Sequence, residues 1–170
     1  MALTTAQLIT LKAAILADAV LNAYPNTSDG NFDMASGGPN QNLGLRALAA
    51  GPNNIGWKSN VVINAIGDAI NGTELAGLST LNNTRLQTLV QLSESGVNPS
   101  VANRRQFFDD IFSGAGGVNT RAALLVLWKR TLNKLEKIFA IGTGSDASPA
   151  TLVVEGSISG ADVTAARNLP

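Results

Sequence analysis

The first stretch of the chain carries apolar residues at helical spacing. This spacing predicts a helix over residues 5–23, which Pro25 ends because proline cannot continue a helix. Thr4 and Gln7 have the separation of a capping box, in which a side-chain hydroxyl and a side-chain amide each accept a hydrogen bond from a backbone N–H. The sequence therefore predicts where this helix begins as well as where it ends.

The predicted first helix is apolar on two sides. At 100° per residue, one side carries Leu8, Leu11 and Ile15, and the opposite side carries Ile9, Leu16 and Val20. Such a helix is either buried centrally within its own fold or packed once in its own chain and once against another subunit. Both interpretations remain open from the sequence.

Residues 25–56 read mainly as loop, because Gly, Asn, Pro and Asp dominate 26–31 and 36–41. A short helical piece is expected between Gln41 and Ala50, with Leu43, Leu45 and Leu48 as its apolar residues. The next segment, 57–70, is ambiguous. Its valines near Val61 favour a strand, but its later apolar residues have helical spacing, and we favour a helix.

Two helices are expected in the middle of the chain. The first covers residues 82–95, and Gly96 is placed to cap its C-terminus. The second begins after Asn98, with Pro99 in its first turn, where a missing N–H costs nothing. It carries four large core candidates, Phe107, Phe108, Ile111 and Phe112, and a flexible connector at 113–117 follows it.

The strongest helical pattern covers residues 119–141, with a broad apolar face that includes Leu124, Trp128, Leu135 and Phe139. The opposite face is basic. Its candidates for contact with the DNA of a channel or with an acidic partner are Lys129, Arg130, Lys134 and Lys137. No aromatic side chains alternate with them, so base stacking is not implied, and a solvated helix face is the alternative.

The pattern changes after residue 141. Residues 142–150 have linker composition, 152–158 favour a strand, and 161–168 favour a short helix. A lone strand must pair with a distant segment, such as the one near Val61, or with another chain. We therefore expect a mainly α protein: a helical bundle with long loops over 1–141, and an extended C-terminal arm with a short β segment over 142–170.

The amino-acid composition limits which catalytic groups and metal ligands the chain can offer. The 170 residues contain no His and no Cys, which excludes imidazole bases, thiol nucleophiles, disulfides and the usual zinc sites. Basic and acidic residues number 12 each, and charged residues make up only 14% of the chain, against roughly 25% in soluble domains. A nearly neutral surface is poorly protected against association, so one expectation is that partners cover part of it. The alternative is an ordinary soluble protein with neutral polar loops.

Three small clusters of Gly, Asp and Asn residues have some likeness to phosphate-binding or metal-binding motifs. Gly142, Gly144 and Asp146 follow a helix and lack the Lys of a phosphate-binding loop, so they read as a helix-ending turn. Asp109 and Asp110 diverge by about 100° on a helix and cannot share a proton or a metal. An Asn/Asp cluster lacks the spacing of a calcium loop and reads as turns: Asn26, Asp29, Asn31 and Asp33. We expect no enzymatic activity, no metal and no cofactor.

The N-terminus lacks a basic region before its apolar part, and Lys12 interrupts that part. It therefore reads neither as a signal peptide nor as a membrane span, and we expect a protein made in a cytoplasm with no membrane partner.

Several segments resemble a family of small proteins encoded by tailed bacteriophages. They are MALTTAQLITLKAAI at the start, NPSVANRRQFFDDIFSGAGGVNTRAALLVLWKR at 98–130, LEKIFAIGTGSDASPATLVVEG at 135–156 and the closing DVTAARNLP. Residues 32–60 diverge from the pattern, and nothing is carried across them.

The resemblance implies a virion component of the head–tail junction, similar to head-to-tail adaptors that form rings, commonly of twelve copies, below the portal. The implied partners are further copies of the chain, the portal protein, a downstream tail protein and, non-specifically, packaged DNA. The residues expected at subunit or portal contacts are Ile9, Leu16, Val20, Leu152, Val153, Val154 and Ile158. A capsid decoration or other tail accessory protein is the first alternative. A small lysis enzyme and a DNA-binding regulator are disfavoured by the composition.

Overall fold

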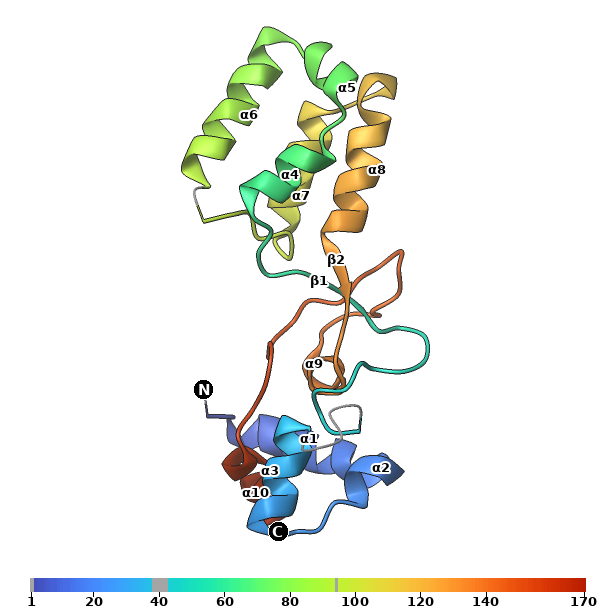
Figure 1. Ribbon diagram of the computed structural model, residues 1–170, viewed down its shortest axis with the longest axis vertical. Helices are drawn as coiled ribbons and strands as arrows, with labels where there is room; N and C mark the ends of the chain where they lie inside the picture. The colour runs from blue at the N-terminus through green and yellow to red at the C-terminus, as the bar shows by residue number, and fades with distance from the viewer. Residues whose placement is uncertain (1, 38–42, 94) are drawn as a thin grey trace. The chain divides into compact units, whose positions relative to one another are not determined.

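The computed structural model describes residues 2–37, 43–93 and 95–170, and this part of the chain is mainly α-helical, as the sequence predicts (Figure 1). The first helices are α1 (Thr5–Ala17), α2 (Ala19–Asn22) and α3 (Ser28–Ser36), followed by strand β1 (Ile55–Trp57). The middle of the chain forms α4 (Ile63–Ala69), α5 (Gly72–Ala76), α6 (Thr80–Leu92), α7 (Ala102–Ile111), the 3₁₀ turn η1 (Ala115–Gly117) and α8 (Val118–Leu127). The last elements are β2 (Lys129–Thr131), α9 (Lys134–Phe139) and α10 (Gly160–Arg167).

The chain forms two compact units. The first comprises residues 1–56 and 131–170, and the second comprises 57–130. The chain leaves the first unit along β1 and returns along β2, and these two short strands pair with each other. This division differs from the expected core of 1–141 with an arm of 142–170, because the C-terminal segment belongs to the same unit as the N-terminus.

The start of α1 is as predicted. Gln7 N donates to Thr4 Oγ1 over 3.3 Å, and Thr4 N donates to Gln7 Oε1 over 2.8 Å, which completes the capping box. The predicted helix does not run unbroken to residue 23. Asp18 adopts an extended backbone and caps α2, accepting hydrogen bonds from Val20 N and Leu21 N. A short polar side chain that bonds to the backbone ahead of it favours such a break.

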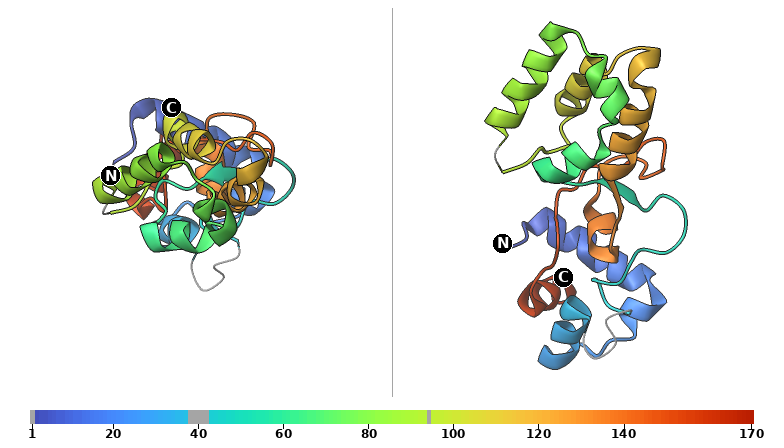
Figure 2. Two further views of the ribbon diagram at one scale, coloured as in Figure 1. Left: turned by 90° about the horizontal axis from the view of Figure 1, so that it is seen from above. Right: turned by 45° about the horizontal axis from the view of Figure 1, so that its top comes forward.

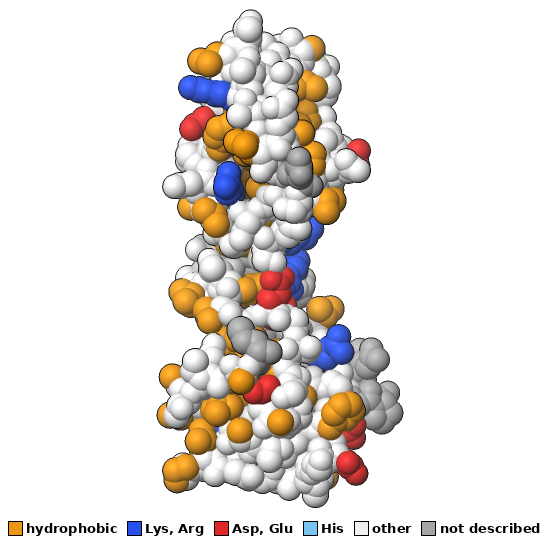
Figure 3. Space-filling model, turned by 90° about the vertical axis from the view of Figure 1, so that its left-hand side faces the viewer, with side chains coloured by type: hydrophobic (Ala, Val, Ile, Leu, Met, Phe, Trp, Pro, Cys, Tyr) orange, Lys and Arg blue, Asp and Glu red, His pale blue; other side chains and the backbone are white. Residues whose placement is uncertain are grey.

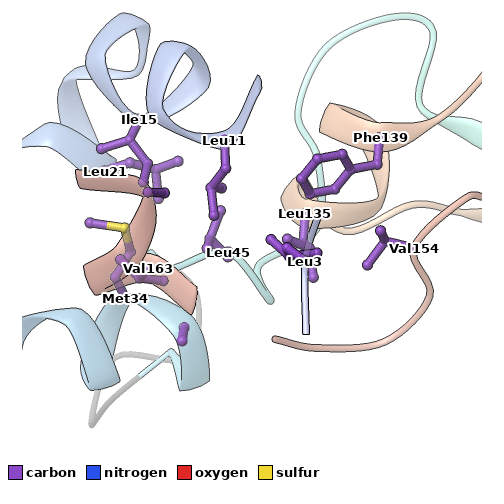
Figure 4. Close-up of a cluster of buried hydrophobic side chains, with 12 residues drawn as sticks. Leu3, Leu11, Ile15, Leu21, Met34, Leu45, Leu135, Phe139, Val154 and Val163 are labelled. Atoms are coloured by element: carbon purple, nitrogen blue, oxygen red, sulfur yellow. The ribbon is translucent and has the colours of Figure 1, made fainter. Parts of the chain in front are cut away.

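The core of the first unit is built from both ends of the chain (Figure 4). Met34 of α3 lies against Val163 of α10, and Leu11 of α1 points toward Leu45. Helix α3 was not predicted, because its Asn, Asp and Gly residues read as turns. Residues 43–50 form turns rather than the predicted helical piece, whose first two residues lie outside the described part.

The C-terminal segment is not an extended arm. Val154 is 2% exposed, Val163 and Ala166 are buried, and α10 packs along α3 and α1. The approach of α10 to α3 is close: a Cβ on Gly160 would lie 2.9 Å from Phe32 Cα, which only a glycine avoids. The predicted strand over 152–158 does not form. Ala150 and Thr151 make isolated bridges to Gly56 and Ile141 instead, so apolar burial rather than strand pairing holds the following residues.

Two buried polar groups tie the C-terminal segment to the rest of the first unit. Glu136 accepts hydrogen bonds from Asn133 N and Gly156 N, each over 3.0 Å, and Asn133 Nδ2 donates to Gly156 O. The Asn31 side-chain amide donates to Thr164 Oγ1 over 3.0 Å and accepts from Arg167 Nη1 over 2.9 Å. Both networks satisfy polar groups that would be costly to bury unpaired.

The long helix predicted over 119–141 is wrong. Helix α8 ends at Leu127, β2 follows, and Asn133 starts α9 with its own capping box. The apolar stripe is real but serves two cores. Leu124 and Trp128 are buried in the second unit, whereas Leu135 and Phe139 are buried in the first. An apolar period can therefore continue across a break when each side of the break has its own core to fill.

The second unit packs α4 against α8 and α6 against α7 around an aromatic core, an arrangement that can be followed in Figures 1 and 2. Phe108 and Trp128 meet edge to face with ring centroids 5.5 Å apart, a favourable geometry. The helix predicted within 57–70 forms at 63–69. Residues 99–101 form a turn rather than the first turn of the predicted helix, because the Asn98 side chain binds Ser100 N.

Candidate assembly surfaces

The described acidic side chains of the second unit do not gather into a metal site. Glu74 is nearly buried and accepts hydrogen bonds from Asn119 N and Thr120 N at the start of α8, over 2.9 and 2.8 Å. Burial alone would raise the pKa of Glu74, but hydrogen bonds from Thr120 and Asn119 outweigh it and hold that pKa below its ordinary value. Within the described residues, no three acidic side chains come close enough to hold a metal.

The outward side of α1 is largely apolar, with Lys12 at its edge. Ile9 and Leu16 are 57% and 60% exposed, and Val20 on α2 is also exposed. The small exposed residues Ala6 and Ala13 lie on the same side of α1. The nearest charges are held elsewhere, since Lys12 donates to Leu169 O and Asp18 pairs with Lys134 over 3.0 Å. Central burial of this helix within the chain is therefore ruled out, because one of its two apolar sides faces outward.

The predicted contact residues near the C-terminus fall into two groups, one at the surface and one packed in or against the core. Val153 is exposed and Leu152 is half-buried, whereas Ile158 packs against the core of the first unit. The prediction that Val154 is a contact residue is wrong. Val154 lies in the core and offers no outward surface, because this segment folds back onto the first unit.

The prediction of a single basic helix face is also wrong, because no single helix carries its four residues. Lys129 and Arg130 lie on β2, in the second unit, and Lys134 and Lys137 lie on α9, in the first. Lys134 pairs with Asp18, and Lys137 Nζ donates to Ala50 O and Pro52 O, each over 3.2 Å. The two lysines of α9 therefore hold the first unit together instead of forming a stripe for phosphates.

A groove between α6 and α7 was not predicted. It has a volume of about 530 Å³, and its apolar lining includes Leu89, Leu92, Val101 and Phe107. Thr84 and Thr88 also line it, and their hydroxyls donate to the carbonyls of Thr80 and Thr84, which leaves their methyl groups for the groove. Leu92 is 79% exposed at its edge. Leu92 lies outside the apolar face of α6 that carries Leu86 and Leu89, and this was the sequence signal that could have indicated the groove.

Two exposed arginines border this groove, Arg85 on α6 and Arg104 on α7. No acidic residue is among the described residues that line it. The groove therefore combines an apolar floor with a positively charged rim, which suits an apolar side chain with carboxylates beside it.

Helix α3 presents a side chain of that kind. Phe32 is 62% exposed, Asp29 lies one turn before it on the same side of the helix, and the half-buried Asp33 follows it about 100° around the helix. Neither carboxylate has a hydrogen bond or an ion pair within the described part of the chain. The sequence placed these aspartates in a turn and left Phe32 unassigned.

On the face that carries α6, hydrophobic side chains lie among uncharged polar ones, and Lys, Arg, Asp and Glu side chains appear at several places between them (Figure 3). No helix in the described ranges is long and apolar enough to cross a membrane. The chain matches no protein-family model, no curated protein and no solved structure.

Proposed function

We propose that the chain is a structural protein of a tailed-bacteriophage virion, a head-to-tail connector that forms a ring below the portal. The observation that supports this most is the outward side of α1, where Ile9 and Leu16 are exposed and the nearby Lys12 is held by Leu169 O. Burying such a face against a neighbour removes apolar area from water with little cost of desolvating charge.

The proposed mechanism is geometric. Each copy uses one surface to contact its neighbour or the portal, and the closed ring extends the portal channel toward the next tail component. The sequence segments that resemble the phage family lie in both units, at 1–15, 98–130 and 135–156 among others. Lys134 and Lys137 are engaged within the first unit, so the proposal assigns them no contact with packaged DNA.

The test is the mass of the complex formed when the purified chain is mixed with portal rings. A complex of fixed stoichiometry is expected for the wild type, and the variant Ile9→Glu/Leu16→Glu should bind at least about tenfold more weakly, because two charges would be buried at the contact. Val126→Glu, at an exposed position on α8, is the matched control. A chain that ignores portal and binds expanded capsid shells would favour the decoration alternative.

A further inference from the structure

The α6–α7 groove and the exposed side of α3 both carry apolar groups, and the charged residues beside them have opposite signs. The groove offers apolar walls from Leu89, Leu92 and Phe107. Phe32 is an aromatic side chain left largely in water, although aromatic rings are among the groups that gain most from burial at an interface. A ring of this size fits easily within the roughly 530 Å³ of the groove.

The charges around the two surfaces are opposite. Arg85 and Arg104 border the groove, and Asp29 and Asp33 both lie to one side of Phe32 on α3. The same asymmetry extends over the units: residues 57–130 contain seven basic and five acidic residues, and the rest of the chain contains five basic and seven acidic ones. Opposite potentials favour encounter in one orientation and disfavour pairing of like surfaces.

We propose that α3 of one copy docks into the α6–α7 groove of a second copy of this chain. Phe32 fills the groove between Leu92 and Phe107, and the carboxylates of Asp29 and Asp33 face the guanidinium groups of Arg85 and Arg104. The aromatic ring supplies most of the affinity, because exposed ion pairs contribute little. The ion pairs fix the orientation and select the partner.

This contact is directional, because the Phe32 side of α3 and the α6–α7 groove are different surfaces. A head-to-tail contact of this kind repeats from copy to copy, and it closes into a ring when the rotation between copies allows. The inference rests on the proposed function for its biological setting. Its physical content, self-association through α3 and the groove, is independent of the portal.

The test measures the mass of the full chain over a concentration series by sedimentation equilibrium. The wild type should associate, and Phe32→Ser should raise the dissociation constant at least about tenfold, as expected when the central aromatic residue of a contact is lost. Leu48→Ser removes an equally exposed apolar side chain elsewhere and should leave association unchanged. Far-ultraviolet circular dichroism checks that each variant is folded.

Charge exchange makes the test specific to this pair of surfaces. Asp29→Arg/Asp33→Arg alone and Arg85→Glu/Arg104→Glu alone should each weaken association, and an equimolar mixture of the two double variants should restore it, since opposite charges then meet again. Arg46→Glu/Asp68→Arg, at exposed positions outside both surfaces, is the control.

A wild type that stays monomeric at every concentration overturns the inference, as does a Phe32→Ser chain or a charge variant that associates as tightly as the wild type. Absence of rescue in the mixture overturns the proposed charge pairing. Because portal binding is measured separately, a chain that binds portal without associating through α3 would refute this contact and leave the proposed function standing.

Discussion

At the scale of single residues, several of the few charged side chains of this protein form hydrogen bonds within the chain. Glu74 and Glu136 each accept backbone N–H groups at the start of a helix, and Lys137 donates to two backbone carbonyls. Unpaired backbone groups at helix ends need such partners, and a carboxylate at an N-terminus also interacts favourably with the helix dipole. Other charged side chains, such as Asp29, Arg85 and Arg104, remain exposed.

Replacing Glu74 by Gln should lower stability at neutral pH. The new amide keeps one oxygen as an acceptor but places its NH2 group against either Asn119 N or Thr120 N, which is itself a donor. Because the folded-state pKa of Glu74 lies below its ordinary value, the stability it contributes is present above pH of about 4 and is lost as pH falls further.

Thermal melts at pH 7 and at lower pH check this prediction. The difference in Tm between wild type and Glu74→Gln should be largest at pH 7 and should shrink below pH of about 4. Asp68→Asn, at an exposed position on α4, should change Tm little at either pH. An undiminished difference in acid would contradict the assigned role of the carboxylate.

At the scale of elements, local signals predicted the beginnings of helices better than their continuity. The capping box at Thr4 and the helix over 161–168 were readable because both depend on neighbours in sequence. The break at 128–133 was not readable, because it depends on the pairing of β2 with the distant β1. Helix α3 was missed for a similar reason: its core contact, Val163, lies at the other end of the chain.

Asn133 is the residue that separates α9 from the preceding strand, and Asn133→Ala should destabilise the first unit by about 1–2 kcal/mol. It would remove the acceptor for Glu136 N and the donor to Gly156 O. Asn133→Ser keeps a capping oxygen and should lie between alanine and the wild type. Urea titrations measure the three free energies of unfolding. An alanine variant as stable as the wild type would contradict the role given to this cap.

At the scale of the whole molecule, the sequence predicted a mainly α protein but not its division. Residues 57–130 lie within the sequence of the first unit, and each unit fills its own core. A single apolar stripe over 119–141 concealed this, since no local feature tells which core Trp128 or Leu135 joins. Ile9 and Leu16 of α1 and Val20 of α2 are exposed, and α3 and the α6–α7 groove, which sequence patterns did not single out, are the further surfaces that we propose for assembly.

The most direct measurement is the number of copies of this chain per portal ring in purified virions, by quantitative mass spectrometry of the particles. A connector ring predicts a small fixed ratio to the portal protein, close to one copy per portal subunit. Hundreds of copies per particle would indicate a shell protein instead. Complete absence of the chain from particles that contain portal would contradict a structural role in the virion.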